Sequence, residues 1–299
     1  MRNHQRKGRR EMKKTVLIMT WIVLASLLLA ACAGPGGGET QPSQATATSP
    51  AAEPTEAPGS TEAAGEAGAL PDLAGREVTV AVENAYPPFN YIDEASGEAV
   101  GWDYDAVREI CNRLNCTPVF QEAAWDGIFP AMAAGEFDML ADGVTYTEER
   151  DKEIDFSIPY VTVGQVLLVR ADETATVDEM KADETKLVGT QIGTTNEIVA
   201  LEHFTQARVQ SFEDFGAPVQ AVLSGDIDAV VIDNISALGF MGANEGQLKV
   251  IGQLTSDEQL AFGFPPGSEL IEPVNAALES MIADGSLEEM NREWGLVQD

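Results

Sequence analysis

The sequence is poor in positive charge. It has 18 Lys or Arg against 49 Asp or Glu, and its formal net charge at pH 7 is −31. Nucleic-acid backbones and anionic lipids attract basic surfaces, so this balance argues against both as electrostatic partners. A solvated acidic surface, favoured by solubility or by a saline habitat, is the simplest explanation. Steering of cationic ligands is a second one, which salt screens beyond about 8 Å.

Histidine and the motifs of common enzymes are also scarce. Beyond the N-terminal segment the sequence has one histidine, His203, and it contains no G-x-S-x-G, H-E-x-x-H or P-loop motif. Hydrolytic, zinc and nucleotide chemistry therefore lack the residues that they require. We therefore predict no cofactor, no metal and none of these three kinds of catalysis.

The N-terminus combines a basic segment with a short apolar one. MRNHQRKGRREMKK precedes an apolar run from Thr15 to Ala31, which is too short for a secure transmembrane helix and is typical of an export signal. Leu29-Ala30-Ala31-Cys32 resembles the lipobox of bacterial lipoproteins, in which cleavage leaves a lipid-modified cysteine. We predict a signal peptide at residues 1–31, with Met12 as an alternative start, and lipidation of Cys32. Removal of the signal takes away seven Lys or Arg and one Glu, which changes the net charge from −31 to −37.

A segment of low complexity follows the cysteine. From Ala33 to about Leu70 the chain consists mainly of Ala, Gly, Pro, Ser, Thr and Glu and has no aromatic residue, so it cannot bury a core. A flexible chain of about forty residues has an r.m.s. reach of roughly 35 Å. We predict a lipid-anchored disordered linker at residues 32–70 and a folded part that begins near Pro71.

Short β-rich runs alternate with helical patterns along the folded part. Val78–Val82 and Val119–Gln121 are typical of strands, whereas Tyr104–Leu114 and Ile128–Ala134 are typical of helices. A second such unit runs from Lys186 to Val231. This alternation predicts an α/β protein with largely parallel sheets.

An internal repeat indicates that the two units share one plan. AMAAGEFDML at residues 131–140 and AVLSGDIDAVV at residues 221–231 both read as a helix closed by glycine and followed by a strand. Tyr160–Val169 and Gln253–Phe264 would carry the chain between two lobes, and two such crossings form a hinge. We predict lobe 1 at residues 71–162 and 257–299, lobe 2 at residues 163–256, and one amphipathic helix from Ile271 to Trp294.

The segment ADGVTYTEERDKEIDFSIPY, residues 141–160, carries a polar turn and an arginine between two strand signals. Gly143 allows close backbone approach, Thr145 offers a hydroxyl, and the planar fork of Arg150 suits a free carboxylate. The segment resembles the motif GxTxTxER...DFSxPY of the bacterial extracellular solute-binding proteins, family 3, which feed polar amino acids to ABC transporters. The residues alone also allow a capping box of Thr145 and Glu148, with Arg150 solvated.

The resemblance covers Val78 to about Trp294 and implies a two-lobed, type II periplasmic-binding-protein fold. Arg150 would bind the ligand α-carboxylate. By position, Glu83 corresponds to a residue that contacts the ligand amino group, and Tyr86 and Trp125 correspond to aromatic residues that line the pocket. An aromatic at either place is more often part of a core. Asp103, in the motif GWDYD, reads as structural.

In lobe 2 the resemblance implies a second group of ligand residues. Gln191, Thr194 and Thr195 open a helix, and the unpaired N–H groups of a helix N-terminus suit a carboxylate. Asp233 corresponds to the family's acid for the ligand α-ammonium. The alternatives are a plain capping box of Thr194 and Glu197 and an N-cap role for Asp233.

These residues together predict a trap for a zwitterion. The carboxylate would meet Arg150, Thr145 and the Thr195 amide, and the ammonium would meet Asp233 and Gly143. Neither lobe completes the trap alone, so closure is expected to be coupled to binding.

The side chain of the ligand is expected to face Asp142. By resemblance this position lies at the side-chain end of the pocket, and its acid favours a cationic ligand such as arginine or lysine. In the alternative, Asp142 caps the turn at Gly143, and glutamine or another neutral polar amino acid is bound.

Cys111 and Cys116 are the two cysteines of the folded part. Some members of the family carry a similar disulfide. Positions i and i+5 of a continuous helix would be a poor geometry for such a bond, so the sequence leaves the pairing open.

The resemblance further implies an ABC transporter permease as partner and a monomer that is lipid-anchored on the extracytoplasmic face of the cell membrane. Two other functions stay open on the same scaffold. One is a dehydratase-like enzyme, and the other is a ligand sensor for a membrane receptor.

Overall fold

A computed structural model of the protein describes residues 69–297. The predicted signal peptide, Cys32 and nearly all of the predicted linker lie outside the described residues. Within residues 69–297 the fold is mixed α/β with two five-stranded sheets, which confirms the predicted fold class. No helix in this part of the chain is long and apolar enough to cross a membrane.

The first large sheet has the strand order β5-β1-β6-β15-β7, in which β1 is parallel to β5 and β6. Its strands are β1 (Arg76–Val82), β5 (Cys116–Glu122), β6 (Met139–Leu140), β7 (Asp155–Phe156) and β15 (Gly263–Phe264). The accompanying helices are α1 (Trp102–Leu114), α2 (Ile128–Ala133), the 3₁₀ turn η1 (Arg150–Lys152), α7 (Ile271–Asp284) and α8 (Ser286–Glu293). A small antiparallel sheet consists of β2 (Ala85–Tyr86), β3 (Asn90–Ile92) and β4 (Ala99–Val100). We call these elements together lobe 1.

The second large sheet has the strand order β11-β10-β12-β9-β13, in which β10 is parallel to β11 and β12. Its strands are β9 (Gln165–Arg170), β10 (Val188–Gln191), β11 (Val209–Phe212), β12 (Ala229–Asp233) and β13 (Leu248–Gln253). Its helices are α3 (Val177–Ala182), α4 (Thr195–His203), α5 (Gly216–Ser224) and α6 (Asn234–Ala243). We call these elements lobe 2.

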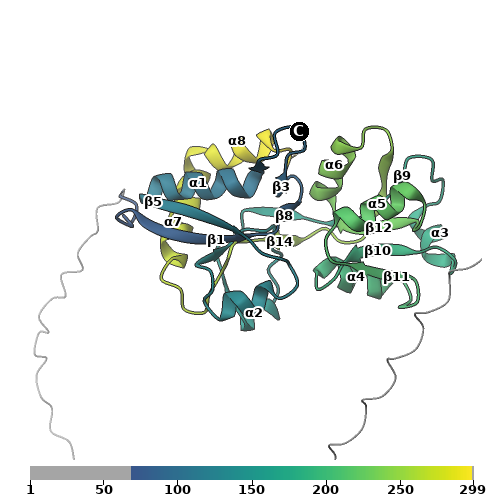
Figure 1. Ribbon diagram of the computed structural model, residues 1–299, viewed down its shortest axis with the longest axis horizontal. Coiled ribbons are helices and arrows are strands. Elements are labelled where there is room, and N and C mark those ends of the chain that lie inside the picture. The colour runs from purple at the N-terminus through teal and green to yellow at the C-terminus, as the bar shows by residue number, and fades with distance from the viewer. Residues whose placement is uncertain (1–68, 298–299) are drawn as a thin grey trace, which may run out of the picture. The chain divides into compact units, whose positions relative to one another are not determined.

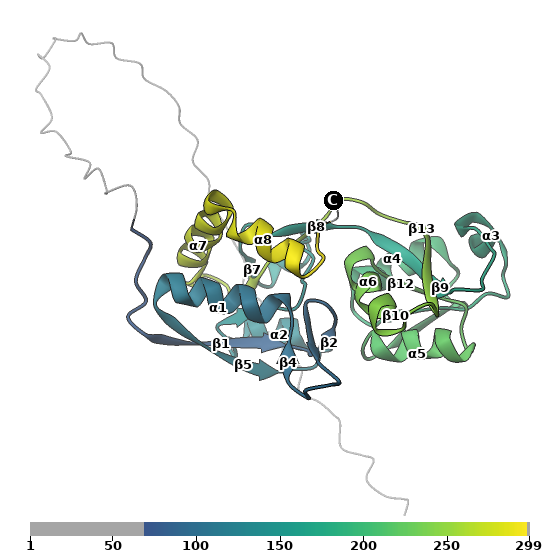
Figure 2. The same ribbon diagram turned by 90° about the horizontal axis from the view of Figure 1, so that it is seen from above.

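The chain passes between the lobes twice, and the two passages pair with each other. β8 (Val161–Val163) leads into lobe 2, β14 (Glu258–Leu260) leads back, and the two strands form an antiparallel sheet of their own. Figures 1 and 2 show β8 between the lobes, and the returning chain ends in helices α7 and α8 beside α1 of lobe 1.

The internal repeat found in the sequence is present in the structure. Gly135 and Gly225, both with positive φ, follow the two helices. Three residues after each glycine stands an aspartate, Asp138 or Asp228. The Asp138 carboxylate accepts a hydrogen bond from the Thr79 backbone N–H (2.9 Å), and the Asp228 carboxylate accepts one from the Leu187 N–H (2.9 Å). Each aspartate therefore fastens its own strand to the neighbouring parallel strand.

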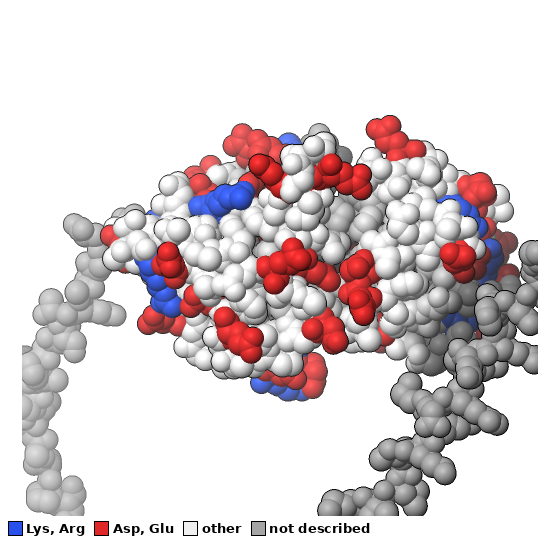
Figure 3. Space-filling view, in the orientation of Figure 1, with Lys and Arg blue, Asp and Glu red and all other residues white. Residues whose placement is uncertain are grey.

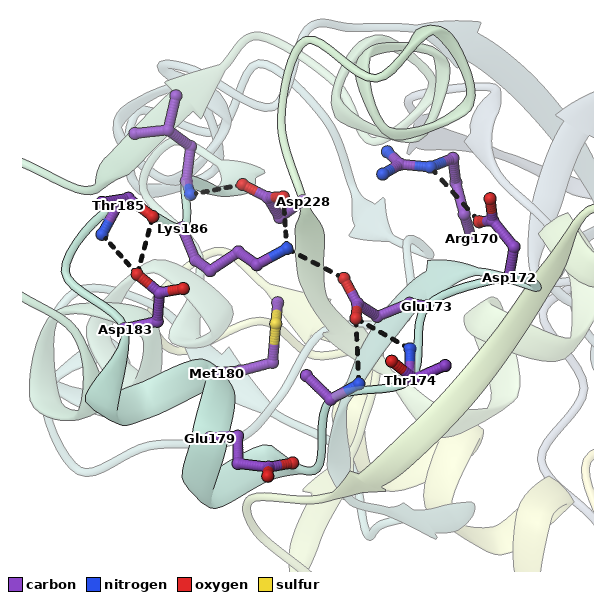
Figure 4. A network of polar contacts seen from close by, with 12 residues as sticks. Arg170, Asp172, Glu173, Thr174, Glu179, Met180, Asp183, Thr185, Lys186 and Asp228 are labelled. Carbon is purple, nitrogen blue, oxygen red and sulfur yellow. Dashed lines mark hydrogen bonds and ion pairs between the residues drawn. The ribbon is translucent and has the colours of Figure 1, made fainter.

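In each lobe a basic side chain pairs with the aspartate that joins the two parallel strands. Arg76 contacts Asp138 at 3.1 Å, and Lys186 contacts Asp228 at 2.9 Å. Lys186 also contacts Glu173 at 3.0 Å, so it joins the start of β10 to the loop after β9 (Figure 4). Hydrogen bonds from backbone N–H groups and the Lys186 charge lower the pKa of Glu173 to about 2.

The C-terminal helix differs from the sequence prediction. Gly285 interrupts the predicted helix of Ile271–Trp294, because it closes α7 at φ +82° and stands at the N-cap of α8. A left-handed residue at this place is easy for glycine and ends the regular hydrogen bonding of α7. The turn lets α8 pack against α1, where the Trp102 Nε1–H donates to Asn291 Oδ1 at 2.7 Å.

Cys111 and Cys116 form a disulfide with a Cα–Cα distance of 4.5 Å. The bond does not lie within a continuous helix, because α1 ends at Leu114 and Asn115 adopts the left-handed conformation. Cys116 is already the first residue of β5, so the disulfide crosses the helix–strand corner.

The repeat generates a stability prediction. Asp228→Ala should lower the free energy of unfolding by about 2 kcal/mol, because the Leu187 N–H and Lys186 both lose a hydrogen-bonded carboxylate. Asp226→Ala is the matched control, since Asp226 is exposed and bonds Ser224. Urea denaturation followed by circular dichroism measures both variants. Equal midpoints for the two variants would contradict the fastening role of Asp228.

Candidate functional site

The predicted site residues meet at the carboxyl ends of parallel strands from both lobes. Glu83 follows β1 and Asp142 closely follows β6 in lobe 1, whereas Gln191 ends β10 and Asp233 ends β12 in lobe 2. Ligands of open α/β sheets characteristically bind at this edge. The two edges therefore enclose a common space.

That space is a narrow cavity, and its empty volume is about 300 Å³ when the part open to solvent is included. All eleven residues predicted to bind a ligand line it: Glu83, Tyr86, Trp125, Asp142, Gly143, Thr145, Arg150, Gln191, Thr194, Thr195 and Asp233. Asn196 and Phe215 line it as well and were not predicted. Asn196 lies next to predicted residues at the start of α4, so its place could have been inferred, whereas nothing in the sequence around Phe215 marks it.

Arg150 is held in place by a carbonyl group and by aromatic rings. Its Nη1–H donates to the Thr145 carbonyl oxygen at 2.8 Å, and its guanidinium carbon lies 5.3 Å from the ring centroid of Trp125 and 4.7 Å from that of Phe129. Within residues 69–297, no carboxylate lies within 4.0 Å of it. Burial lowers the pKa of Arg150 to about 10, so the group stays charged at neutral pH.

The alternative of a capping box at Thr145 is not observed. Thr147, rather than Thr145, accepts a hydrogen bond from the Arg150 N–H through its side-chain oxygen at 3.1 Å. The Thr145 hydroxyl instead lies 3.4 Å from the Thr195 hydroxyl of lobe 2. Arg150 reaches the same lobe through Nη2, which donates to the Gly193 carbonyl oxygen at 3.4 Å.

The start of α4 is capped, as the sequence allowed. Thr194 is the N-cap residue, and its hydroxyl oxygen accepts a hydrogen bond from the Glu197 N–H at 3.1 Å. The reciprocal bond of a capping box, from the Thr194 N–H to the Glu197 carboxylate, is not formed. The Glu197 carboxylate instead accepts a hydrogen bond from the Gly193 N–H at 2.8 Å. The cap fixes Thr194 and Thr195 at the cavity wall, so capping and lining occur together.

Asp233 stands at the N-cap of α6 but makes no capping hydrogen bond with its side chain. Its Oδ2 accepts a hydrogen bond from the Tyr86 hydroxyl of lobe 1, and its Oδ1 accepts one from Asn196 Nδ2 at 3.1 Å. Burial raises the pKa of Asp233 to about 6. The side chain thus faces the cavity, and the simple capping role is wrong.

Two further acids stand on the lobe 1 side of the cavity. The Glu83 carboxylate accepts a hydrogen bond from Gln191 Nε2 of lobe 2 at 2.7 Å, and Asp142 accepts one from Asn90 Nδ2 at 2.7 Å. Burial raises the pKa of both carboxyl groups. No hydrogen bond of the described residues joins the Asp142 side chain to the Gly143 turn, so the turn-capping alternative is not observed.

The aromatic walls are anchored in the interior of the protein. Tyr86 stacks on Phe89 with ring centroids 5.3 Å apart and on Phe215 of lobe 2 at 5.4 Å. Trp125 meets Phe129 edge to face at 5.3 Å. Both rings are therefore core residues on one side and cavity residues on the other, which reconciles the two interpretations of the sequence.

The chain was compared with known proteins. It is 27% identical over 216 residues to the L-cystine-binding protein TcyJ of Escherichia coli. The matched region covers 72% of this chain and 81% of that protein. Two solved structures of an ancestral arginine-binding protein share 35% of their residues with it. The one bound to arginine has a TM-score of 0.68 and covers 74% of this chain and 99% of its own, and the one bound to glutamine has a TM-score of 0.67 and covers 73% and 97%.

A further similar structure bears on the choice between binder and enzyme. It is the ancestral amino acid-binding protein AncCDT-1, described as a precursor of cyclohexadienyl dehydratase, with 32% identity, a TM-score of 0.66, and coverage of 73% of this chain and 94% of its own. All of these relatives are described as binding proteins. Residues 78–297 match the family model for bacterial extracellular solute-binding proteins, family 3. The chain belongs to this family.

Proposed function

We propose that the protein is the extracytoplasmic substrate-binding component of an amino-acid ABC importer. The observation that carries this proposal is the pair of opposite charges across one cavity. Arg150 of lobe 1 has no carboxylate within 4.0 Å among the described residues, and Asp233 of lobe 2 lines the opposite wall. A zwitterionic α-amino acid offers one group to each.

In this proposal the ligand carboxylate takes the free donors of the Arg150 fork. A guanidinium binds a carboxylate through two parallel N–H···O bonds, which give both energy and orientation. The Thr145 and Thr195 hydroxyls stand beside it, and the N-terminus of α4 adds the favourable field of a helix end. The α-ammonium is placed at Asp233, whose carboxylate is already hydrogen-bonded on both oxygens.

Binding is proposed to stabilise the closed arrangement of the lobes. Side-chain contacts join the lobes at the cavity, among them those of Tyr86 with Asp233, Glu83 with Gln191, and Thr145 with Thr195. The chain passages β8 and β14 form the only paired strands outside the sheets of the two lobes, among the described residues, and are proposed as the hinge. A ligand that touches both walls shifts the population toward closure by its difference in affinity for the two states.

A cationic side chain is the proposed ligand class. Glu83 and Asp142 stand at the proposed side-chain end of the cavity. Among the described residues that line the cavity, Arg150 is the one cation, and it is already assigned to the ligand carboxylate. Among the charged residues on the face drawn in Figure 3, acidic ones predominate, which would favour the approach of a cation at low salt. Arginine and lysine fit this charge best.

Catalysis on the same scaffold is the second candidate, because one similar structure is a precursor of a dehydratase. We favour binding without turnover, since the named relatives are binding proteins. Incubation of the pure protein with the amino acid that it binds, followed by product analysis, separates the two. Any conversion above the uncatalysed rate would favour the enzyme.

Arg150→Lys tests the central claim. Loss of the bidentate fork should weaken amino-acid binding by about 2 kcal/mol or more, which is roughly thirtyfold in the dissociation constant. Isothermal titration calorimetry measures the effect. Arg108→Lys is the control, because Arg108 is a surface residue that pairs with Asp105. Unchanged affinity in Arg150→Lys would remove the carboxylate clamp.

Asp142→Asn tests the ligand class. The amide can still accept from Asn90 Nδ2, so the substitution removes charge with little change of shape. A cationic ligand should lose about 1.5 to 3 kcal/mol, whereas a neutral one should lose little. Titrations with arginine, lysine and glutamine measure the difference. Tight binding of glutamine by the wild type without detectable arginine or lysine binding would end the cationic proposal.

Attachment to the membrane through a lipid on Cys32 is proposed from the sequence, with residues 32–70 as a tether. Cys32→Ser should leave the protein unacylated, so it should move from the membrane fraction to the soluble fraction after cell fractionation. A chain that begins at Pro71 should bind the ligand as well as the full chain does, because the cavity residues all follow that position. Membrane recovery of Cys32→Ser equal to wild type would exclude the anchor.

A further inference from the structure

Behind the cavity, two buried carboxyl groups share one amide. Asn90 Nδ2 donates to Asp142 Oδ1 at 2.7 Å and to Asp103 Oδ2 at 2.8 Å. Asp142 is 3% exposed and lines the cavity, whereas Asp103 and Asn90 are fully buried and do not line it. The second oxygen of each acid, Asp103 Oδ1 and Asp142 Oδ2, has no hydrogen-bond partner within residues 69–297. We call these three residues the acid bridge.

The acid bridge comes from three separate elements of lobe 1. Asp103 lies in the first turn of α1, Asn90 begins β3, and Asp142 follows β6. Gly101, just before α1, has φ +138°, and an added Cβ would lie 2.1 Å from the Phe89 carbonyl oxygen. The chain therefore passes so close to the residue before Asn90 that only glycine fits, and this fixes Asp103 beside Asn90.

Two ionised carboxylates in this arrangement are unfavourable. An ionised carboxylate in a protein interior needs several donors. The Asn90 amide gives one N–H to each acid, and the backbone N–H groups of Gly143 and Glu83 lower the pKa of Asp103 and Asp142 by less than burial raises it. Like charges held together by one amide also repel each other, so the pair tends to retain a proton. Burial raises the pKa of Asp103 to about 7, and burial together with the Asp103 charge raises the pKa of Asp142.

Glu83, Tyr86 and Tyr160 feel the charges of the bridge, and Asp233 and Arg150 stand at the same cavity as Asp142. Glu83 follows β1, Tyr86 belongs to β2, Tyr160 precedes β8, Asp233 ends β12, and Arg150 begins η1. The Tyr160 hydroxyl is buried and also has no partner in the described part of the chain. Arg150 and Asp233 are assigned to the two ends of the ligand backbone, and Glu83 is bonded to Gln191. Burial and the Asp142 charge also raise the pKa of Glu83 to about 8, so the charge next to the ligand side chain depends on Glu83 as well as on the bridge.

We propose that Asp103 is a specificity-determining residue that acts through Asn90 and Asp142, so that the pair ionises fully against a cationic side chain and keeps a proton against a neutral one. The inference rests on the proposed amino-acid site. Asp103 is a positioning residue, because it touches Asp142 only through the amide. When a cationic ligand binds, the Asp142 carboxyl group becomes a carboxylate and its proton passes to solvent. A neutral ligand leaves the proton in place.

The sign of the pH effect follows from this proton. Binding of arginine that releases a proton becomes tighter as the pH rises, by up to about tenfold per pH unit while the bridge is protonated, and levels off once the bridge has ionised. Binding of glutamine should change little over the same range. The ratio of arginine to glutamine affinity therefore rises with pH.

Calorimetry of the wild type gives the first test. Titrations with arginine and with glutamine at pH 6.5, in two buffers of different ionisation enthalpy, count the protons released on binding. We expect release with arginine and none with glutamine. Equal proton counts for the two ligands, or glutamine binding without any arginine binding, would overturn the specificity role.

Asp103→Asn gives the second test, because its amide oxygen can still accept from Asn90 while the charge is removed. Without the Asp103 charge, Asp142 ionises more readily, so the pH at which arginine affinity falls should move down by about one unit. Asp126→Asn is the matched control, since it removes the same charge from an exposed residue beside Trp125. If Asp103 had a purely structural role, Asp103→Asn would instead change the affinities for arginine and for glutamine by the same factor at all pH values. That result would overturn the proposal.

A ligand-free measurement separates this inference from the proposed function. Carbon-13 NMR of labelled aspartate side chains, titrated from pH 4 to 9, should show two coupled carboxyl groups that titrate near neutral pH, and Asp103→Asn should remove the coupling. Titration of all aspartates near pH 4 would overturn the proposal whichever ligand binds. If no amino acid binds the wild type, the proposed function fails, while this titration still decides the state of the bridge.

Discussion

A half-buried guanidinium that has no carboxylate within 4.0 Å in residues 69–297 is the constraint around which the site is arranged. Removing such a charge from water is expensive unless other groups compensate for it. Here the Thr145 carbonyl, two aromatic rings and the more distant charge of Asp233 give partial compensation. A ligand carboxylate would complete it. In the proposed function, the energy of closure would thus come from satisfying groups that the protein alone leaves short of partners.

The two lobes present these groups at the same edge because they are built by the same device. In each lobe an aspartate binds the N–H of the adjacent parallel strand and a basic residue beside it, which sets the register of the two strands. With the strand starts fixed, β1 and β6 end together in lobe 1 and β10 and β12 end together in lobe 2. The residues just past those ends then need no long loops to reach the cavity, and short connections hold them more rigidly.

Much of the fold and of the cavity lining could be predicted from the sequence, and the features that could not be predicted depend on contacts between distant parts of the chain. The motif at residues 141–160 and the Gly–Asp repeat depend on local spacing, so α/β alternation, two lobes and the lining residues could be inferred. The break at Gly285 was missed because glycine is tolerated within helices, and only packing of α8 on α1 decides where the chain turns. Phe215 and Asn90 act through contacts with residues far away in the chain, and a single sequence contains no record of such contacts.

The acids of this chain fall into two groups with different consequences. Those on the surface are solvated, and salt screens their field within about 8 Å, so they influence solubility and the approach of a ligand more than its identity. Glu83, Asp103 and Asp142 are different, because burial makes each of their charges costly unless something opposes it. In the proposal made above, Glu83 and Asp142 at the cavity wall and Asp103 behind it would gain or lose protons with the charge of the ligand, so selectivity would depend on the pH of the compartment that the site faces. The strongly negative composition is therefore a weaker guide to the ligand than the carboxyl groups at the cavity are.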